Sequence, residues 1–177
     1  KALDTGELTF IVAGRPYHAD PLIHQKVGQI LADLGVNVLT DDVFRKPESK
    51  GFRKLNIVSQ WSYPNRVVQS AMEVAKLPDN IQLIQLNSFG CGPDSFFMDE
   101  TRDILRVAGK NITVLRIDEI ASPGSVRLRL RSLVESLKAS GDNSPKTPVS
   151  YKGYSTPYKK ERDSNKTILI PWLADFI

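Results

Sequence analysis

The single cysteine of the chain lies between two glycines in the segment 89–94, FGCGPD. Glycine lets the backbone approach a bulky group closely, and backbone N–H groups in such a loop can point at sulfur. A thiolate is also stabilised near the start of a helix. These features make Cys91 a candidate metal ligand or reactive thiol. A cysteine buried at the end of a strand explains the same residues equally well, and both interpretations stay open.

A second segment whose residue types could take part in binding or catalysis is 14–20, GRPYHAD, which follows an apolar run. An arginine close to a helix N-terminus suits an anion, and a histidine in a loop can act as an acid, a base or a hydrogen-bond donor. The candidate cleft residues here are Gly14, Arg15, Tyr17 and His18. In the structural alternative, Gly14 makes a tight turn and Arg15 pairs with a nearby acid. We expect His24, farther along, on the surface of a helix.

Three more residues complete the set of candidates for ligand binding. Asp94 follows Cys91 closely, and Asn65 and Arg66 end the segment 61–66, WSYPNR. This aromatic and polar segment either lines a cleft or packs against another domain, and packing is the favoured interpretation. The arginines at 127, 129 and 131 are interpreted as a solvated helix face.

Several well-known catalytic motifs are absent from the sequence. GxGxxG, the Walker loop GxxxxGK[ST], the nucleophile elbow GxSxG and the zinc motif HExxH do not occur. One cysteine cannot hold an iron–sulfur cluster, because such clusters take four ligands. Any cluster bound through Cys91 therefore needs ligands from elsewhere.

Short apolar runs alternate with helical periodicity along the chain, which predicts the elements that position these residues. We expect strands at 8–13, 36–39, 81–86, 111–117 and 166–171. We expect helices from an Asp20 cap to residue 34, and at 62–76, 95–108 and 122–137. This order is typical of an α/β protein with a doubly wound, mostly parallel five-stranded sheet, a flavodoxin-like or Rossmann-like three-layer sandwich. In the flavodoxin-like strand order, the segments 14–20 and 88–94 face each other.

Composition and charge narrow the function classes. The chain has 177 residues, of which 41% are hydrophobic and 25% charged, as in globular proteins. The net charge of +4 is concentrated in 138–166, so a specific nucleic-acid reader is not expected. No apolar run is long enough for a membrane span, and a single cysteine favours the cytoplasm. We expect 1–177 to be a single domain taken from a longer chain, with a long loop at 41–60 and a linker or excursion at 140–165.

Four segments in this order resemble the 2-hydroxyacyl-CoA dehydratase superfamily. They are GRPYHADPLIHQKVGQILADLGVNVLTDD, WSYPNR, NSFGCGPDS and IDEIASPGSVRLRLRSLVESL. The likeness covers about 8–138 and resumes at 166–171. It is greatest to long activase-related proteins of this superfamily, activators of (R)-2-hydroxyglutaryl-CoA dehydratase. In these proteins an ATPase-like part precedes a dehydratase-subunit-like part.

The resemblance implies a dehydratase-subunit-like module of an ATP-coupled iron–sulfur protein. Such subunits hold a [4Fe–4S] cluster through cysteines drawn from more than one domain, and Cys91 occupies a position similar to one of these ligands. The implied partners are other domains of the same chain, an ATPase activase that injects one electron, and an acyl-CoA substrate. The chain has no ATPase phosphate motif, so we expect it to be inactive alone and to hold no stable cluster by itself.

Two other functions remain as alternatives. The first is a non-catalytic scaffold or interaction domain that docks onto the rest of its chain through Trp61, Tyr63 and Trp172. It predicts an exposed apolar patch and no cleft near Cys91. The second and weaker alternative is a flavin or nucleotide binder. The fold alone is not evidence for this function. The cluster hypothesis predicts instead that Cys91 lies at the carboxyl edge of the sheet and faces the first loop.

Overall fold

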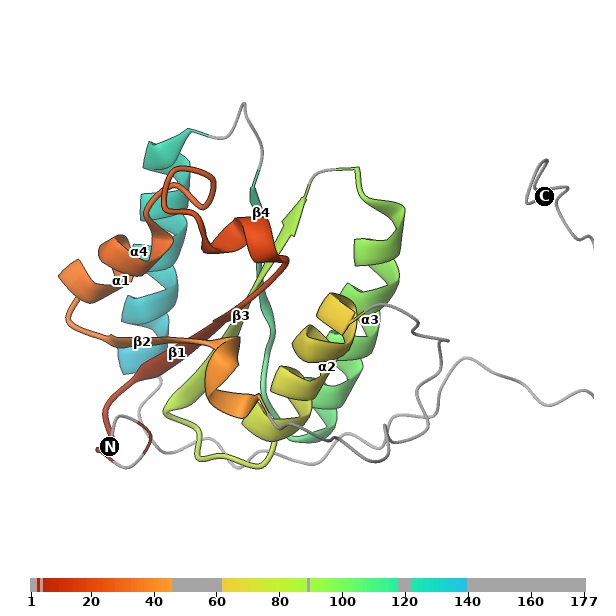
Figure 1. Cartoon of the computed structure of the whole chain (residues 1–177). Coiled ribbons are helices and arrows are strands. Elements are labelled where there is room, and N and C mark those ends of the chain that lie inside the picture. Colours follow the sequence, from red (N-terminus) through yellow and green to blue (C-terminus); the bar gives the residue numbers. More distant parts are fainter. Residues whose placement is uncertain (1–2, 4, 46–61, 89, 118–121, 140–177) are drawn as a thin grey trace, which may run out of the picture.

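A four-stranded parallel sheet forms the centre of the molecule in the computed structural model. The structure describes residues 3, 5–45, 62–88, 90–117 and 122–139. The strand order is β2-β1-β3-β4 (Figure 1), and this confirms the α/β class, the parallel pairing and the contact of the first and third strands. The strands are β1 (Thr9–Ala13), β2 (Asn37–Thr40), β3 (Ile81–Ser88) and β4 (Thr113–Ile117).

Helices cover both faces of this sheet, as Figure 1 shows. On one face lie α1 (Val27–Asp33) and α4 (Pro123–Ala139). On the other face lie α2 (Ser62–Val74) and α3 (Gly92–Val107). Two short 3-10 helices, η2 (Pro16–Ala19) and η3 (Asp41–Phe44), follow β1 and β2 at the carboxyl edge. No helix in these ranges has the length and apolar character needed to cross a membrane.

The apolar pattern of β3 shows why the sheet needs helices on both sides. Ile81 and Leu83 belong to the core beneath α2 and α3, whereas Ile84 and Leu86 belong to the core beneath α1 and α4. Successive side chains of a strand point to opposite faces, so a continuous apolar run is buried only if helices pack on both faces of the sheet. Each fully buried aliphatic side chain contributes about 1.5–3 kcal/mol relative to exposure.

Several predictions fall on parts of the chain that the structure does not describe. The fifth strand predicted at 166–171 and the linker predicted at 140–165 lie outside the described residues. The same holds for Trp61, Trp172 and most of the loop predicted at 41–60. Of that predicted loop, the described part forms the short 3-10 helix η3.

The predicted start of the first helix is wrong. The helix begins at Val27 and not at an Asp20 cap, because Gln25 and Lys26 adopt left-handed backbone conformations with φ of 52° and 59°. Such residues cannot continue a right-handed helix. The Asp20 side chain instead accepts a hydrogen bond of 2.8 Å from the backbone N–H of Leu22. The segment before Val27 is therefore a series of turns at the edge of the sheet.

The third helix starts earlier than predicted, and this changes the setting of the cysteine. It begins at Gly92 with Cys91 as the N-cap residue, whereas the sequence pattern indicated a start at 95. Pro93 fits the first turn because its missing N–H has no helical partner there. Gly90 supplies a left-handed turn with φ of 72° just before the cap. The sulfur thus sits at a helix N-terminus. The other predicted helices agree with α2 and α4 to within two residues.

Candidate functional site

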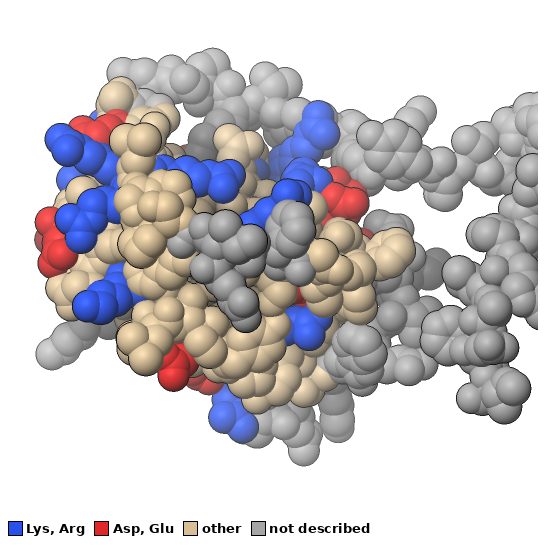
Figure 2. Space-filling view, turned by 90° about the horizontal axis from the view of Figure 1, so that it is seen from above, with Lys and Arg blue, Asp and Glu red and all other residues tan. Residues whose placement is uncertain are grey.

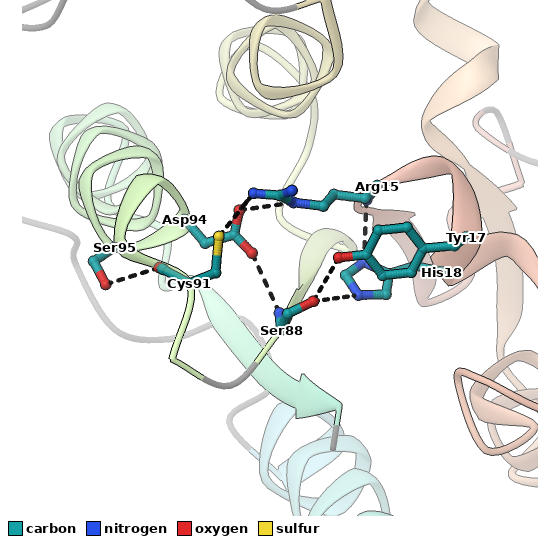
Figure 3. A network of polar contacts seen from close by, with 7 residues as sticks. All are labelled: Arg15, Tyr17, His18, Ser88, Cys91, Asp94 and Ser95. Atoms are coloured by element: carbon teal, nitrogen blue, oxygen red, sulfur yellow. Dashed lines mark hydrogen bonds and ion pairs between the residues drawn. The ribbon is translucent and has the colours of Figure 1, made fainter. Parts of the chain in front are cut away.

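The two candidate segments meet at the carboxyl edge of the sheet through Arg15. Its Nε and Nη2 lie 3.0 and 2.7 Å from Asp94 Oδ1, and Nη2 lies 2.8 Å from Cys91 Sγ (Figure 3). Arg15 follows β1, whereas Cys91 and Asp94 follow β3, and the strand order makes these strands neighbours. The predicted position of Cys91, at this edge and facing the first loop, is confirmed.

Asp94 fixes the arginine in place. Its side chain is buried at the start of α3, and its Oδ2 accepts the backbone N–H of Ser88 at 3.2 Å. The hydrogen bond from Arg15 to this carboxylate is the main cause of the raised pKa of Arg15. Charge-assisted bonds of this kind are roughly twice as strong as neutral ones. A permanent, oriented positive charge therefore lies beside the sulfur of Cys91.

His18 occupies a buried position behind this pair. Its Nδ1 accepts the backbone N–H of Arg15 at 3.1 Å, so the neutral ring carries its proton on Nε2. That Nε2 lies 3.4 Å from Ser88 Oγ, which in turn lies 2.6 Å from the hydroxyl of Tyr17. Because Nε2 is protonated, it cannot take a proton from Ser88. The three side chains do not form an activated serine nucleophile.

Arg66 lies in a different part of the edge from Cys91. Its Nη2 is 3.0 Å from Asp41 Oδ2 and 2.8 Å from Asp42 Oδ1. A cavity of about 240 Å³ separates this group from the Arg15 network, and Gly14, Arg15, His18 and Arg66 all line it. Asn65 is half-buried on α2, and its Oδ1 finds no hydrogen-bond donor among the described residues. The structure thus brings Arg66, but not Asn65, into a cavity shared with the first loop.

Sequence reasoning missed the two carboxylates and misplaced one histidine. Asp41 and Asp42 directly follow β2, and that position at a carboxyl edge was the available signal. They were assigned to a long loop instead. His24 was expected on a helix surface, but it is half-buried, lies before α1 and lines the cavity. The arginines at 127, 129 and 131 are exposed, as expected.

The described part of the chain offers one cysteine sulfur as a candidate metal ligand. The described residues contain no group of three or more His, Cys, Asp or Glu side chains placed to hold a metal ion. Cys91 is half-exposed and carries a free thiol. These residues fit the role of one ligand to a cluster whose other ligands come from outside them.

No protein-family model matches the chain, and no curated protein or solved structure is significantly similar to it. The function is therefore inferred from the geometry around Cys91 and Arg15 and from the sequence motifs.

The buried histidine makes stability depend on pH. Burial is the main cause that lowers the pKa of His18 below its usual 6.5, and Arg15 contributes in the same direction. Below that pH the unfolded chain binds a proton more readily than the folded chain, so the free energy of unfolding decreases as the pH falls. Urea unfolding between pH 7.5 and 5.0 measures this. We expect a shallower loss in His18→Asn, which keeps an acceptor for Arg15. Equal slopes in both proteins would contradict the assignment.

Proposed function

We propose that this domain supplies one cysteine ligand, Cys91, to a [4Fe–4S] cluster in an ATP-coupled iron–sulfur protein related to 2-hydroxyacyl-CoA dehydratase and its activator. The observation that carries the proposal is the half-exposed Cys91 sulfur at the carboxyl edge, 2.8 Å from the Arg15 guanidinium. The proposal includes a flavodoxin-like sheet with a fifth strand and a longer parent chain. Other domains of that chain contribute the remaining ligands, and an ATPase activase and an acyl-CoA substrate are the partners.

The surroundings of the sulfur support a ligand role. A Cβ added at Gly92 would meet no atom within 4 Å, so the flank of Cys91 is open to a bulky group. Figure 2, seen from the carboxyl side of the strands, shows Lys and Arg side chains mixed with Asp and Glu side chains on this face, so the positive charge at the sulfur is that of Arg15. Positive charge and N–H donors stabilise thiolate ligands and the reduced, more negative state of a cluster.

The role of Arg15 in this proposal follows from its two contacts. Asp94 holds the guanidinium by two bonds to one carboxylate oxygen, and the same Nη2 reaches the sulfur. The arginine can therefore donate a hydrogen bond to the Cys91 sulfur without moving. The cluster, when bound, supplies one-electron transfer. The chain's own residues position the sulfur and compensate its charge.

The test is anaerobic reconstitution of the full-length protein with iron and sulfide, comparing wild type with Cys91→Ser. We expect the substitution to remove the cluster, which means a loss of about four irons per chain and of the visible absorption. Ser95→Ala is the matched control, because Ser95 lies on the same helix turn and its hydroxyl donates to the backbone oxygen of Cys91, at 3.5 Å, and not to the sulfur. Full iron content in Cys91→Ser would refute the proposal.

A non-catalytic interaction domain remains the second candidate, and exposed apolar side chains favour it. Leu22 is 83% exposed, and Phe96 and Tyr17 are also exposed near the carboxyl edge. A docking role predicts that Leu22→Ser with Phe96→Ser loosens the contact with the rest of the full-length chain. Limited proteolysis that cuts the double variant no faster than wild type would count against this role.

A further inference from the structure

A second site lies on the other side of the first loop from Cys91, at the carboxyl ends of β1 and β2. It is the cavity of about 240 Å³, in which Thr40, Asp41, Asp42 and Arg66 form a polar wall and which Arg15 also lines. Pockets for drug-sized ligands measure roughly 300–1,000 Å³, so this one suits a small metabolite or one part of a larger one. Cys91 does not line it, so it is separate from the proposed ligand position.

Ion pairs and a hydrogen bond hold the side chains of the polar wall in place. Asp41 has a side chain only 10% exposed, and Arg66 Nη2 lies between it and Asp42 at 3.0 and 2.8 Å. The Thr40 hydroxyl donates to the other oxygen of Asp42 at 3.3 Å. A carboxylate has about four acceptor positions, so both acids retain free lone pairs. These carboxylate oxygens can accept hydrogen bonds from hydroxyl groups, and Arg15, which also lines the cavity, is already paired with Asp94.

Another part of the cavity lining is apolar and leaves open space. Val12, Val27 and Val38 line it, and Gly28 contributes no side chain. A Cβ built at Gly28 would meet no atom within 4 Å. His24 Nδ1 accepts the backbone N–H of Val27 at 3.0 Å, so its neutral ring carries a donor proton on Nε2. Aliphatic side chains with one N–H donor suit a flat heterocyclic ring that has nitrogen or oxygen acceptors.

We propose that this cavity binds a ribonucleoside group, with the ribose 2′- and 3′-hydroxyls donating to Asp41 and Asp42 and the base against Val12, Val27 and Val38. In doubly wound sheets, a carboxylate beyond the second strand is well placed for ribose hydroxyls. Recognition acts on the nucleoside itself, because the loop after β1 has no GxGxxG motif for binding phosphates. This site does not depend on the cluster proposal.

The first test is calorimetric titration of the chain with adenosine, guanosine, cytidine and uridine, each beside its 2′,3′-dideoxy counterpart. We expect at least one ribonucleoside to bind, and its dideoxy counterpart to bind about tenfold more weakly, because the buried Asp41 carboxylate and the exposed Asp42 carboxylate then lose their donors. Binding of the dideoxy compound with equal affinity would overturn the proposal. So would the absence of binding by all four ribonucleosides at millimolar concentration.

Two variants place the ligand in this cavity. Asp42→Asn is expected to weaken the ribonucleoside about tenfold and to leave the dideoxy compound unchanged. Asp99→Asn is the matched control, because Asp99 is an exposed acid on α3 that pairs with Arg102 and does not line the cavity. An equal effect of both substitutions would mean a general charge effect and would overturn the assignment.

Gly28→Leu fills the cavity from α1 and is expected to abolish binding of both compounds. Leucine is a better helix former than glycine, so the thermal midpoint of this variant should equal or exceed that of wild type. Loss of binding in a protein of undiminished stability cannot come from unfolding. Unchanged affinity in Gly28→Leu would place the ligand elsewhere and refute the site.

Discussion

Replacing Lys110 with methionine is expected to lower the free energy of unfolding by about 3 kcal/mol. Lys110 is 4% exposed, and its ammonium nitrogen, whose three protons are shared, lies within hydrogen-bond distance of four backbone oxygens. The oxygens belong to Val74, Leu77, Pro78 and Ile81, at 2.8, 2.7, 2.8 and 3.0 Å. One side chain thus provides hydrogen-bond donors for the backbone carbonyl groups at the end of α2 and in the turn that leads into β3.

The size of this effect follows from what methionine leaves behind. It keeps the apolar stem but donates no hydrogen bond, so the four carbonyl groups lose a partner in a place with little water. The last carbonyls of a helix also favour a cation, and methionine removes it. Urea unfolding measures the difference. Lys76→Met is the control, since Lys76 forms an exposed pair with Glu73 that contributes less than about 1 kcal/mol. A loss in Lys110→Met as small as in the control would contradict this account.

This lysine shows what the sequence pattern can and cannot predict. A basic residue after Gly109 has the appearance of a surface turn, and its four acceptors lie about 30 positions earlier in the chain. Strands β1 and β3 were predictable because their apolar runs are short, continuous and bounded by polar turns. A contact between one side chain and a distant turn has no such local signal.

The candidate site also combines contacts that the sequence predicts with contacts that it does not. The meeting of Arg15 with Cys91 was predictable, because the order of parallel strands places the ends of β1 and β3 side by side. The left-handed conformations of Gln25 and Lys26 were not, because neither residue type favours them. They shift α1 away from Asp20. They also bring His24 to the cavity, which the expected surface position did not suggest.

Gly14→Ala is the second substitution with a large expected effect, a loss of about 2 kcal/mol in the free energy of unfolding. A Cβ at this position would lie 2.6 Å from His18 Nδ1 and 3.1 Å from Leu86 Cβ. The backbone of Gly14 is not left-handed, so the cost is steric and not conformational. Restriction of the unfolded chain by alanine offsets only about 0.4–1 kcal/mol of that cost.

The clash also reaches the sulfur, because His18 Nδ1 is the acceptor for the backbone N–H of Arg15. If His18 moves to make room, that bond is lost, and the Arg15 guanidinium shifts relative to Asp94 and Cys91. Urea unfolding of Gly14→Ala and Gly28→Ala separates the causes. Gly28 has open space at its Cβ, so alanine there should stabilise by about 0.5 kcal/mol. Opposite signs for the two glycines are the expected result. Stabilisation in both would mean that the His18 side chain moves aside without a cost in folding free energy and that Gly14 does not set the position of Arg15.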